Sequence, residues 1–382
     1  MLKLGKKIVK YRIPILILSF LLLIPATISY INTRINYDIL SYLPDDIDTM
    51  KGQEILTDEF GTGAFSICVV EGMDKKGVAA LEEKIKRVDH VNNVIWYDSL
   101  ADLSVPMDVI PEKIRNAFNN DEKGSTLLIA TFDTSTSADE TLDGVEKIRK
   151  LTKNQCFQSG MSATIADIKK ICNTEAVMYV VLAAGLSAIV LALTMDSFLA
   201  PVFFLLSIGM AIVYNLGTNF VAGEISFITQ ALAAVLQLAV TLDYSIFLWH
   251  SYQEYREKYP DEKERAMAHA ISNTIVSVIG SSITTVAGFV AMCFMTFTLG
   301  LDLGIVMAKG VIFGVIGCVT ILPAMILTFD KAIQKTKHKA LMPNMDKIGN
   351  FVTRKYGLFI VLFVVILIPA LYGYTHTNVY YD

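Results

Sequence analysis

Seven apolar stretches, each long enough to cross a lipid bilayer, constrain this chain more than any other feature. A hydrocarbon core about 30 Å thick needs roughly 20 apolar residues in a helix. The stretches cover residues 12–31, 176–195, 200–219, 226–249, 273–295, 303–328 and 357–375. We therefore predict an α-helical membrane protein with a bundle of seven transmembrane helices. Pro25, Pro323 and Pro369 lie near the middle or far end of their stretches, where we expect them to kink or end the helix.

Composition supports this prediction and excludes one class of partner. Of the residues, 53% are hydrophobic and only 18% are charged, which is below the roughly 25% typical of soluble domains. The charged residues do not form a concentrated basic surface of the kind that nucleic acid requires. We therefore expect membrane lipids among the partners of the chain and no nucleic acid.

The lysines and arginines of the loops predict the orientation, because cytoplasmic loops are enriched in them. They gather before the first stretch (Lys3, Lys6, Lys7, Lys10, Arg12), after the fourth (Arg256, Lys258, Lys263, Arg265) and in the linker 329–356. The short loops 220–225 and 296–302 contain none. We expect a multi-pass protein of the cell (plasma) membrane with a cytoplasmic N-terminus, so that residues 32–172 lie outside.

This outside segment has the pattern of an α+β domain. Short β-rich runs cover residues 65–70, 91–97, 126–132 and 155–158, and amphipathic helical patterns cover 77–88 and 138–152, with a shorter one at 111–118. The order β-α-β followed by β-α-β is typical of the split βαβ, or ferredoxin-like, arrangement. A last helix at 163–172 would lead into the second transmembrane helix.

An internal repeat relates the two ends of the chain. Residues 3–38 align without a gap with residues 347–382, and 11 of the 36 positions are identical. The shared residues include Pro25-Ala26 with Pro369-Ala370, and a Thr-x-x-x-Tyr-Asp motif beyond the helix end. We interpret this as the start of a second copy of the same architecture, so the chain is expected to be the N-terminal half of a longer protein, or a fragment of one.

The fourth stretch carries the group with the clearest chemistry. Asp243 lies inside an apolar span, where a charge costs about 2.5–3.5 kcal/mol. Burial raises the pKa of a carboxyl group, as loading and release of a proton near neutral pH require, and the adjacent Tyr244 can hydrogen-bond it. Gln230, Gln237, Thr241 and Tyr244 fall on one stripe of this helix. The alternative is that Asp243 reaches the aqueous boundary near Trp249.

The residues around Asp243 resemble the fourth-helix motif of MMPL-type transporters of the RND superfamily. The motif here is Val-Thr-Leu-Asp-Tyr-Ser-Ile-Phe-Leu, residues 240–248. Further segments resemble the same family: Met195–Pro201, Glu264–Gly280, Ile321–Ala324, and Ser159–Ala163 with Asp167. The resemblance implies an RND-type transmembrane bundle with one α+β extracytoplasmic porter domain.

The resemblance also implies a mechanism. Asp243 and Tyr244 would form one side of a proton relay, facing an equivalent pair in the second half of the transporter. Proton flow would drive export of hydrophobic or amphiphilic compounds or lipids. Two alternatives remain open: a protein-export motor component resembling SecD or SecF, and a non-transporting membrane sensor of the sterol-sensing kind.

Lys309 is the second charge within a predicted transmembrane helix. It could be a counter-ion or a gate residue for a substrate headgroup, or its long side chain could extend outward to water. With Gln230, Gln237 and Thr241 it outlines a candidate transmembrane polar pathway. The glycines of the sixth stretch (Gly310, Gly314, Gly317) and the small polar face of the fifth (Asn273, Ser277, Ser281, Thr284, Thr285, Gly288) are more simply explained by close helix packing.

The sequence thus predicts six regions. They are a first transmembrane helix (1–31), the porter domain (32–172), transmembrane helices two to six (173–328), a cytoplasmic linker (329–356), transmembrane helix seven (357–376) and the start of a second outside domain (377–382). The sequence has no catalytic Ser/His/Asp set, phosphate-binding loop or metal-ligand cluster. We expect no enzyme activity, no metal and no cofactor, with protons as the coupling ion. A homo-oligomer is a further possibility.

Overall fold

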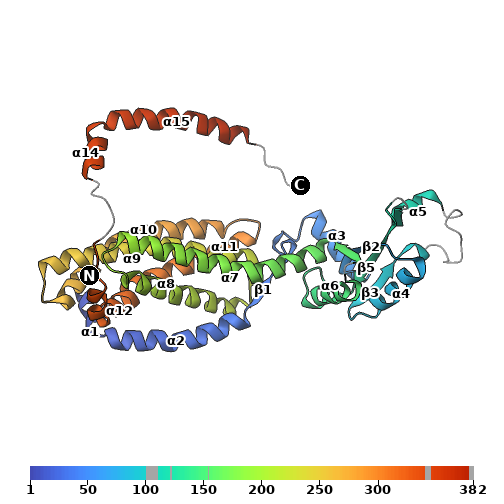
Figure 1. Ribbon diagram of the computed structural model, residues 1–382, viewed down its shortest axis with the longest axis horizontal. Coiled ribbons are helices and arrows are strands. Elements are labelled where there is room, and N and C mark those ends of the chain that lie inside the picture. The colour runs from blue at the N-terminus through green and yellow to red at the C-terminus, as the bar shows by residue number, and fades with distance from the viewer. Residues whose placement is uncertain (100–110, 121–122, 154, 340–345, 378–382) are drawn as a thin grey trace.

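The molecule is elongated, with a helical bundle at one end and an α+β domain at the other (Figure 1). The structure, a computed structural model, describes residues 1–99, 111–120, 123–153, 155–339 and 346–377. The predicted segment 377–382 therefore lies outside the described residues beyond Thr377. We call the end of the bundle that carries the N-terminus the basal end, and the end that faces the α+β domain the domain end.

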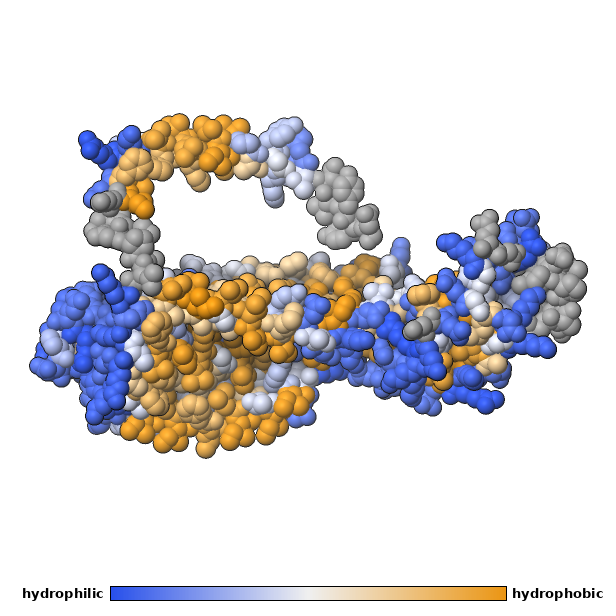
Figure 2. All heavy atoms as spheres, viewed as in Figure 1, coloured by the Kyte–Doolittle hydropathy of each residue, from blue (hydrophilic) through white to orange (hydrophobic). Residues whose placement is uncertain are grey.

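Within the described residues, seven helices are long and apolar enough to cross a membrane, as predicted. They are α2 (Arg12–Asn32), α7 (Met161–Thr194), α8 (Ala200–Gly217), α9 (Phe227–Lys258), α10 (Lys263–Met292), the sixth span from α11 (Leu299–Ile316) to α12 (Leu322–Thr328), and α15 (Tyr356–His376). Figure 2 shows an apolar band over the bundle between a hydrophilic basal end and the hydrophilic α+β domain. The chain is a multi-pass membrane protein by these criteria.

The sixth span and α8 form the centre of the bundle. Most residues of the sixth span and of α8 are buried inside the protein, whereas α2 and α7 expose most of theirs. The sixth span changes to a π-helical turn at Gly317–Ile321 and resumes as α12, with Pro323 in its first turn. Since proline lacks an N–H and cannot continue an α-helical ladder, the break lies where the sequence placed it.

The α+β domain has one antiparallel sheet. Its strands are β2 (Ala64–Glu71), β3 (Val91–Ile95), β5 (Ser125–Phe132) and β6 (Cys156–Ser159), in the spatial order β3-β5-β2-β6, with the two-residue β4 (Asn119–Asn120) paired to β5. Helices α4 (Lys75–Lys86) and α6 (Asp139–Thr152) each connect two of these strands along the chain, and α5 (Glu112–Phe118) precedes β4. Val70, Leu128 and Ile148 are among the buried residues of the core between sheet and helices. The sequence did not predict α3 (Asp48–Asp58), which has no buried residue.

Helix α7 joins the domain to the bundle without a break. The sequence predicted a helix at 163–172 that leads into the second transmembrane helix, and in the structure the two form one 34-residue helix from Met161 to Thr194. Arg149 of α6 holds it through two hydrogen bonds to Asp167, at 2.7 and 2.9 Å. Lys169 donates to Asp139 at 2.8 Å, and its ammonium group lowers the pKa of that carboxyl. A short parallel pairing of β1 (Arg34–Asn36) with β7 (Glu224–Ser226) forms a second connection.

The N-terminal helices pack tightly, whereas their repeated counterparts do not. Helix α1 (Leu2–Lys10) lies against α10, with Gly5 directly on the backbone of Ala268. Its counterpart α14 (Asp346–Arg354) carries Gly349, which has no neighbour within 4 Å on the side where a Cβ would lie. No residue of α15 is buried, and Figure 1 shows α15 apart from the bundle. The repeated pair therefore presents packing surfaces that this chain does not fill.

Replacement of Gly217 by alanine tests the close approach of α2 and α8. A methyl group at Gly217 would overlap the carbonyl oxygen of Ala26 and lie 2.9 Å from its carbonyl carbon. We expect Gly217→Ala to cost about 1–3 kcal/mol through overpacking and to lower the melting temperature of the purified protein in detergent. Gly209→Ala, in the same helix with no neighbour within 4 Å, is the matched control. Equal melting of both variants would contradict the tight contact.

Candidate functional site

Asp243 lies on the exposed face of α9. Residues Leu232, Leu236, Ala239, Asp243, Phe247 and His250 form this face and are all exposed. Asp243 lies six residues before Trp249, which is about 9 Å along the helix axis at 1.5 Å per residue. Because side chains in an α-helix tilt toward its N-terminus, the carboxyl of Asp243 is directed toward the middle of the span, away from the basal end. The chain thus presents one acidic group on a largely apolar surface, with His250 at its basal end.

Tyr244, the neighbour of Asp243, lies inside the protein. Its side chain is 4% exposed, and its hydroxyl lies near the hydroxyls of Ser281 and Thr285 on α10. The small polar face of α10 was interpreted as a packing face, yet Asn273, Ser277, Ser281 and Thr284 are exposed in the described chain. Most of this face is therefore left uncovered in the described chain, apart from the contact of Tyr244 and a hydrogen bond from Asn273 to Ser251 at 3.3 Å.

Gln237 and Thr241 of the predicted polar pathway point to the interior, between α8 and α11. Asn215 of α8 donates to Gln237 at 3.1 Å, and both side chains are at least 96% buried. Thr241 contacts Gly314, and a Cβ at Gly310 would lie 2.8 Å from Asn215. The glycines of α11 leave room for the polar side chains of α8 and α9, as the packing interpretation predicts. We call Asn215, Asn219, Gln237 and Thr241 the buried seam.

The buried seam is only partly satisfied. Asn215 Oδ1, Asn219 Nδ2, Gln237 Nε2 and Thr241 Oγ1 are buried without a hydrogen-bond partner in the described part of the chain. An unpaired buried polar atom costs about 1–3 kcal/mol. These four atoms are therefore available to hydrogen-bond water within the bundle.

Lys309 is half-buried and lies at the domain end of the buried seam. Its ammonium donates to Thr218 at 3.1 Å and to Asn219 at 2.5 Å. Gln230 lies nearer the surface and donates to the hydroxyl of Tyr30 on α2 at 2.8 Å. The structure thus brings Lys309, Gln237 and Thr241 to one seam, and it places Gln230 and Asp243 outside it.

Sequence reasoning missed the acidic residues that fasten the helix ends. Asp302 accepts from Thr229 at 2.5 Å and from the backbone of Ser226 at 3.0 Å, which joins α11 to the start of α9. Its signal in the sequence is weak, because an acidic residue in the first turn of a helix is common for other reasons.

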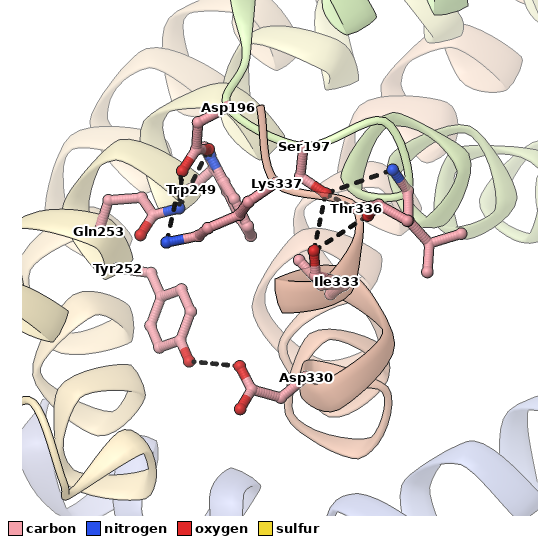
Figure 3. Close-up of polar contacts among 10 residues, drawn as sticks. Asp196, Ser197, Trp249, Tyr252, Gln253, Asp330, Ile333, Thr336 and Lys337 are labelled. Carbon is pink, nitrogen blue, oxygen red and sulfur yellow. Dashed lines mark hydrogen bonds and ion pairs between the residues drawn. The ribbon is translucent and has the colours of Figure 1, made fainter. Parts of the chain in front are cut away.

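A polar junction at the basal end fastens the turn between α7 and α8 (Figure 3). The carboxylate of Asp196 accepts from Trp249 at 3.1 Å and from Gln253 at 2.9 and 3.1 Å, and Lys337 lies 3.7 Å away. The hydroxyl of Ser197 is bonded to that of Thr336 at 2.9 Å. The turn is therefore held both by the end of α9 and by the segment that follows α12.

The helix that follows α12 is fastened in the same way. Asp330 in α13 (Asp330–Lys335) is buried and accepts from Tyr252 at 3.4 Å. Lys263 at 3.4 Å and Arg256 at 3.9 Å supply positive charge. The α9 end, two to three turns beyond Asp243, is thereby linked to the segment that leads toward α14.

Comparison with known proteins places the chain in a family of membrane proteins. The family model described as MMPL family matches residues 41–356. This match covers more than half of the chain, so the chain belongs to the MMPL family.

Two relatives and one solved structure show how far the similarity extends. A protein of Methanocaldococcus jannaschii named as membrane protein MJ1562 is 23% identical over 360 residues, which cover 84% of this chain and 92% of that protein. A Streptomyces coelicolor protein named as membrane protein ActII-3 is 31% identical over 127 residues, 33% of this chain and 17% of that protein. A crystal structure of SecDF in a super-membrane-facing form matches 85% of this chain and 39% of its own, with 12% identity and a TM-score of 0.43.

Replacement of Asp196 tests the basal junction. Asp196→Ala would leave the indole N–H of Trp249, a residue only 2% exposed, without its acceptor. The expected cost of about 1–3 kcal/mol corresponds to roughly fivefold to 150-fold faster hydrogen exchange in residues 330–339. Asp261→Ala removes an exposed aspartate near the same end and serves as control. Unchanged exchange in Asp196→Ala would show that the junction does not hold this segment.

Proposed function

We propose that the chain is the N-terminal half of a secondary transporter, driven by the proton-motive force, that exports hydrophobic or amphiphilic compounds or lipids. The observation that carries this proposal is the exposed carboxyl of Asp243 within the apolar span of α9. A group that changes charge inside a membrane can couple proton movement to a change in conformation. Membership of the MMPL family supports the same class of activity.

The energetics of Asp243 fit a proton carrier. Facing hydrocarbon, its carboxylate would cost about 2.5–3.5 kcal/mol, so the neutral form is favoured unless a polar partner is present. Protonation and deprotonation would then alternate as that partner changes. Proton entry provides about 2.3 kcal/mol per charge per 100 mV of membrane potential, before any pH gradient, which is of the same order as that cost.

We infer that the partner of Asp243 is a second repeat of the same kind. Asp243 and the polar face of α10 together form a surface that this chain leaves uncovered, and α14 and α15 begin a repeated unit. A second Asp-Tyr pair facing Asp243 would supply the polar environment that its charged form requires. A second copy of this chain could provide the same surface in a homo-oligomer.

The orientation that we propose places the basal end in the cytoplasm and the α+β domain outside the plasma membrane. The lysine-rich α1 and the lysines and arginines in the adjoining ends of α9 and α10 support it, because these residues are enriched on the cytoplasmic side. We also assign the α+β domain as a ferredoxin-like porter domain. The strand order β3-β5-β2-β6 with all pairs antiparallel supports this assignment.

We further propose that the buried seam hydrates the bundle during the cycle. Gln237 and Thr241 would hold water. The positive charge of Lys309 would attract anions and repel excess protons at the domain end of the seam. Gln230 would hold α9 against α2 near the outer surface through its hydrogen bond to Tyr30. No enzyme chemistry is part of this proposal, and protons are its only coupling agent.

Replacement of Asp243 tests the proposed function. In the transporter with both halves reconstituted in liposomes, Asp243→Asn should reduce proton flux at least tenfold, because an amide cannot carry the proton. The flux is measured with an enclosed pH-sensitive dye under an imposed membrane potential.

Glu257→Gln is the matched control, since it removes one carboxylate from the exposed polar end of the same helix. It should leave the flux unchanged. Equal flux in Asp243→Asn and the unaltered protein, at equal membrane abundance, would favour a non-transporting sensor.

A further inference from the structure

Helix α1 carries its four lysines on one face. At 100° per residue, Lys3, Lys6, Lys7 and Lys10 fall within an arc of about 100°, and all four are exposed. The opposite face, with Gly5, Ile8 and Val9, is buried against α10 and the rest of the bundle. An amphipathic helix at a membrane surface commonly buries its apolar face in lipid. Here the apolar face is buried against the rest of the protein instead, and the lysines remain directed outward.

Two of these lysines line an open cavity at the basal end. It has a volume of about 1190 Å³ and lies between α1, the start of α2 and the start of α10. Lys6 and Lys10 line it, whereas Lys3 and Lys7 do not. Ile13 and Pro14 form its border with the apolar surface of α2. The cavity therefore joins a basic wall to the part of the protein that faces lipid.

The charges of the cavity leave these two lysines uncompensated. The other cations of the wall are already paired: Arg12 with Glu264 at 2.6 Å, Arg265 with Glu262 at 3.3 Å, and Lys263 with Asp330 at 3.4 Å. None of the ion pairs in the described ranges involves Lys6 or Lys10. Asp261 is the one further carboxylate of the wall. Two unpaired ammonium groups thus face one unpaired carboxylate, and the balance favours an anion.

An apolar track continues from the cavity along α2. Ile13, Ile17 and Leu21 are spaced four residues apart and are 56%, 63% and 60% exposed. Residues at this spacing lie on one face of a helix. The track runs from the basal end toward the domain end, the direction that an acyl chain takes when its headgroup lies at the membrane surface.

We propose that this cavity binds the headgroup of an anionic phospholipid, with its phosphate between Lys6 and Lys10 and an acyl chain along Ile13, Ile17 and Leu21. The lipid would fasten α1 to the start of α2 and α10. The site requires only that α2 spans a bilayer, and it is independent of proton transport by Asp243. A free phosphate offers the same charge but does not use the apolar track.

Native mass spectrometry of the full chain in detergent tests the site. Dioleoylphosphatidylglycerol should bind more tightly than dioleoylphosphatidylcholine. In Lys6→Gln/Lys10→Gln, affinity for the anionic lipid should fall about tenfold to thirtyfold, because each lysine near an anionic surface contributes a few-fold. Affinity for the zwitterionic lipid should not change.

Lys3→Gln/Lys7→Gln removes the same charge from the same helix outside the cavity, and its effect should stay below about threefold. Equal losses of affinity for the anionic lipid in the two variants would mean that the whole basic helix attracts the lipid diffusely. That result would overturn the proposed site. Equal binding of the two lipids would also overturn it. If inorganic phosphate at millimolar concentration displaces the anionic lipid, and this depends on Lys6 and Lys10, the site binds free phosphate and the lipid assignment is wrong. All four lysines are exposed, so both variants should keep the elution volume of the unaltered protein.

Discussion

Hydrocarbon offers no hydrogen bonds, and this constraint governs the whole bundle. Every polar group within the span must find its partner in the protein or be neutral. The structure meets this requirement for Lys309, which reaches Thr218 and Asn219. It meets it in part for Asn215 and Gln237, which share one hydrogen bond. Asp243 lies on a lipid-accessible face and has the strongest need for a partner from elsewhere.

The seven spans could be predicted because bilayer thickness fixes the length of an apolar helix. Their ends could not be predicted, because helices continue beyond the lipid with polar residues. Thus α9 extends nine residues past Trp249 to Lys258, and α7 begins in the domain at Met161. The four longer strands of the α+β domain were predicted within two residues, since runs rich in β-branched residues mark them, whereas the two-residue β4 was not predicted. Helix α3 was missed because no apolar face distinguishes it.

The polar residues of the spans could be found in the sequence, but their partners could not. Gln237 and Thr241 were predicted to share one stripe, and they do face a common interior. Asn215 was overlooked, although a single asparagine within an apolar run is itself a signal. Which helix each side chain meets depends on how the helices are rotated, and this follows from glycines such as Gly310 and Gly314, which allow close approach. That geometry is a property of the packed bundle.

Helix α7 has a mechanical consequence, because it enters the α+β domain without a hinge. Its 34 residues form a rod about 51 Å long at 1.5 Å per residue. A rigid rod of that length pivoting at its basal end by about 5° would carry its other end through about 4 Å. Within the domain, Arg149 binds Asp167 of α7, and Asp196 lies just beyond the opposite end of the helix. Small tilts among the membrane helices would thus become displacements of side-chain size in the domain.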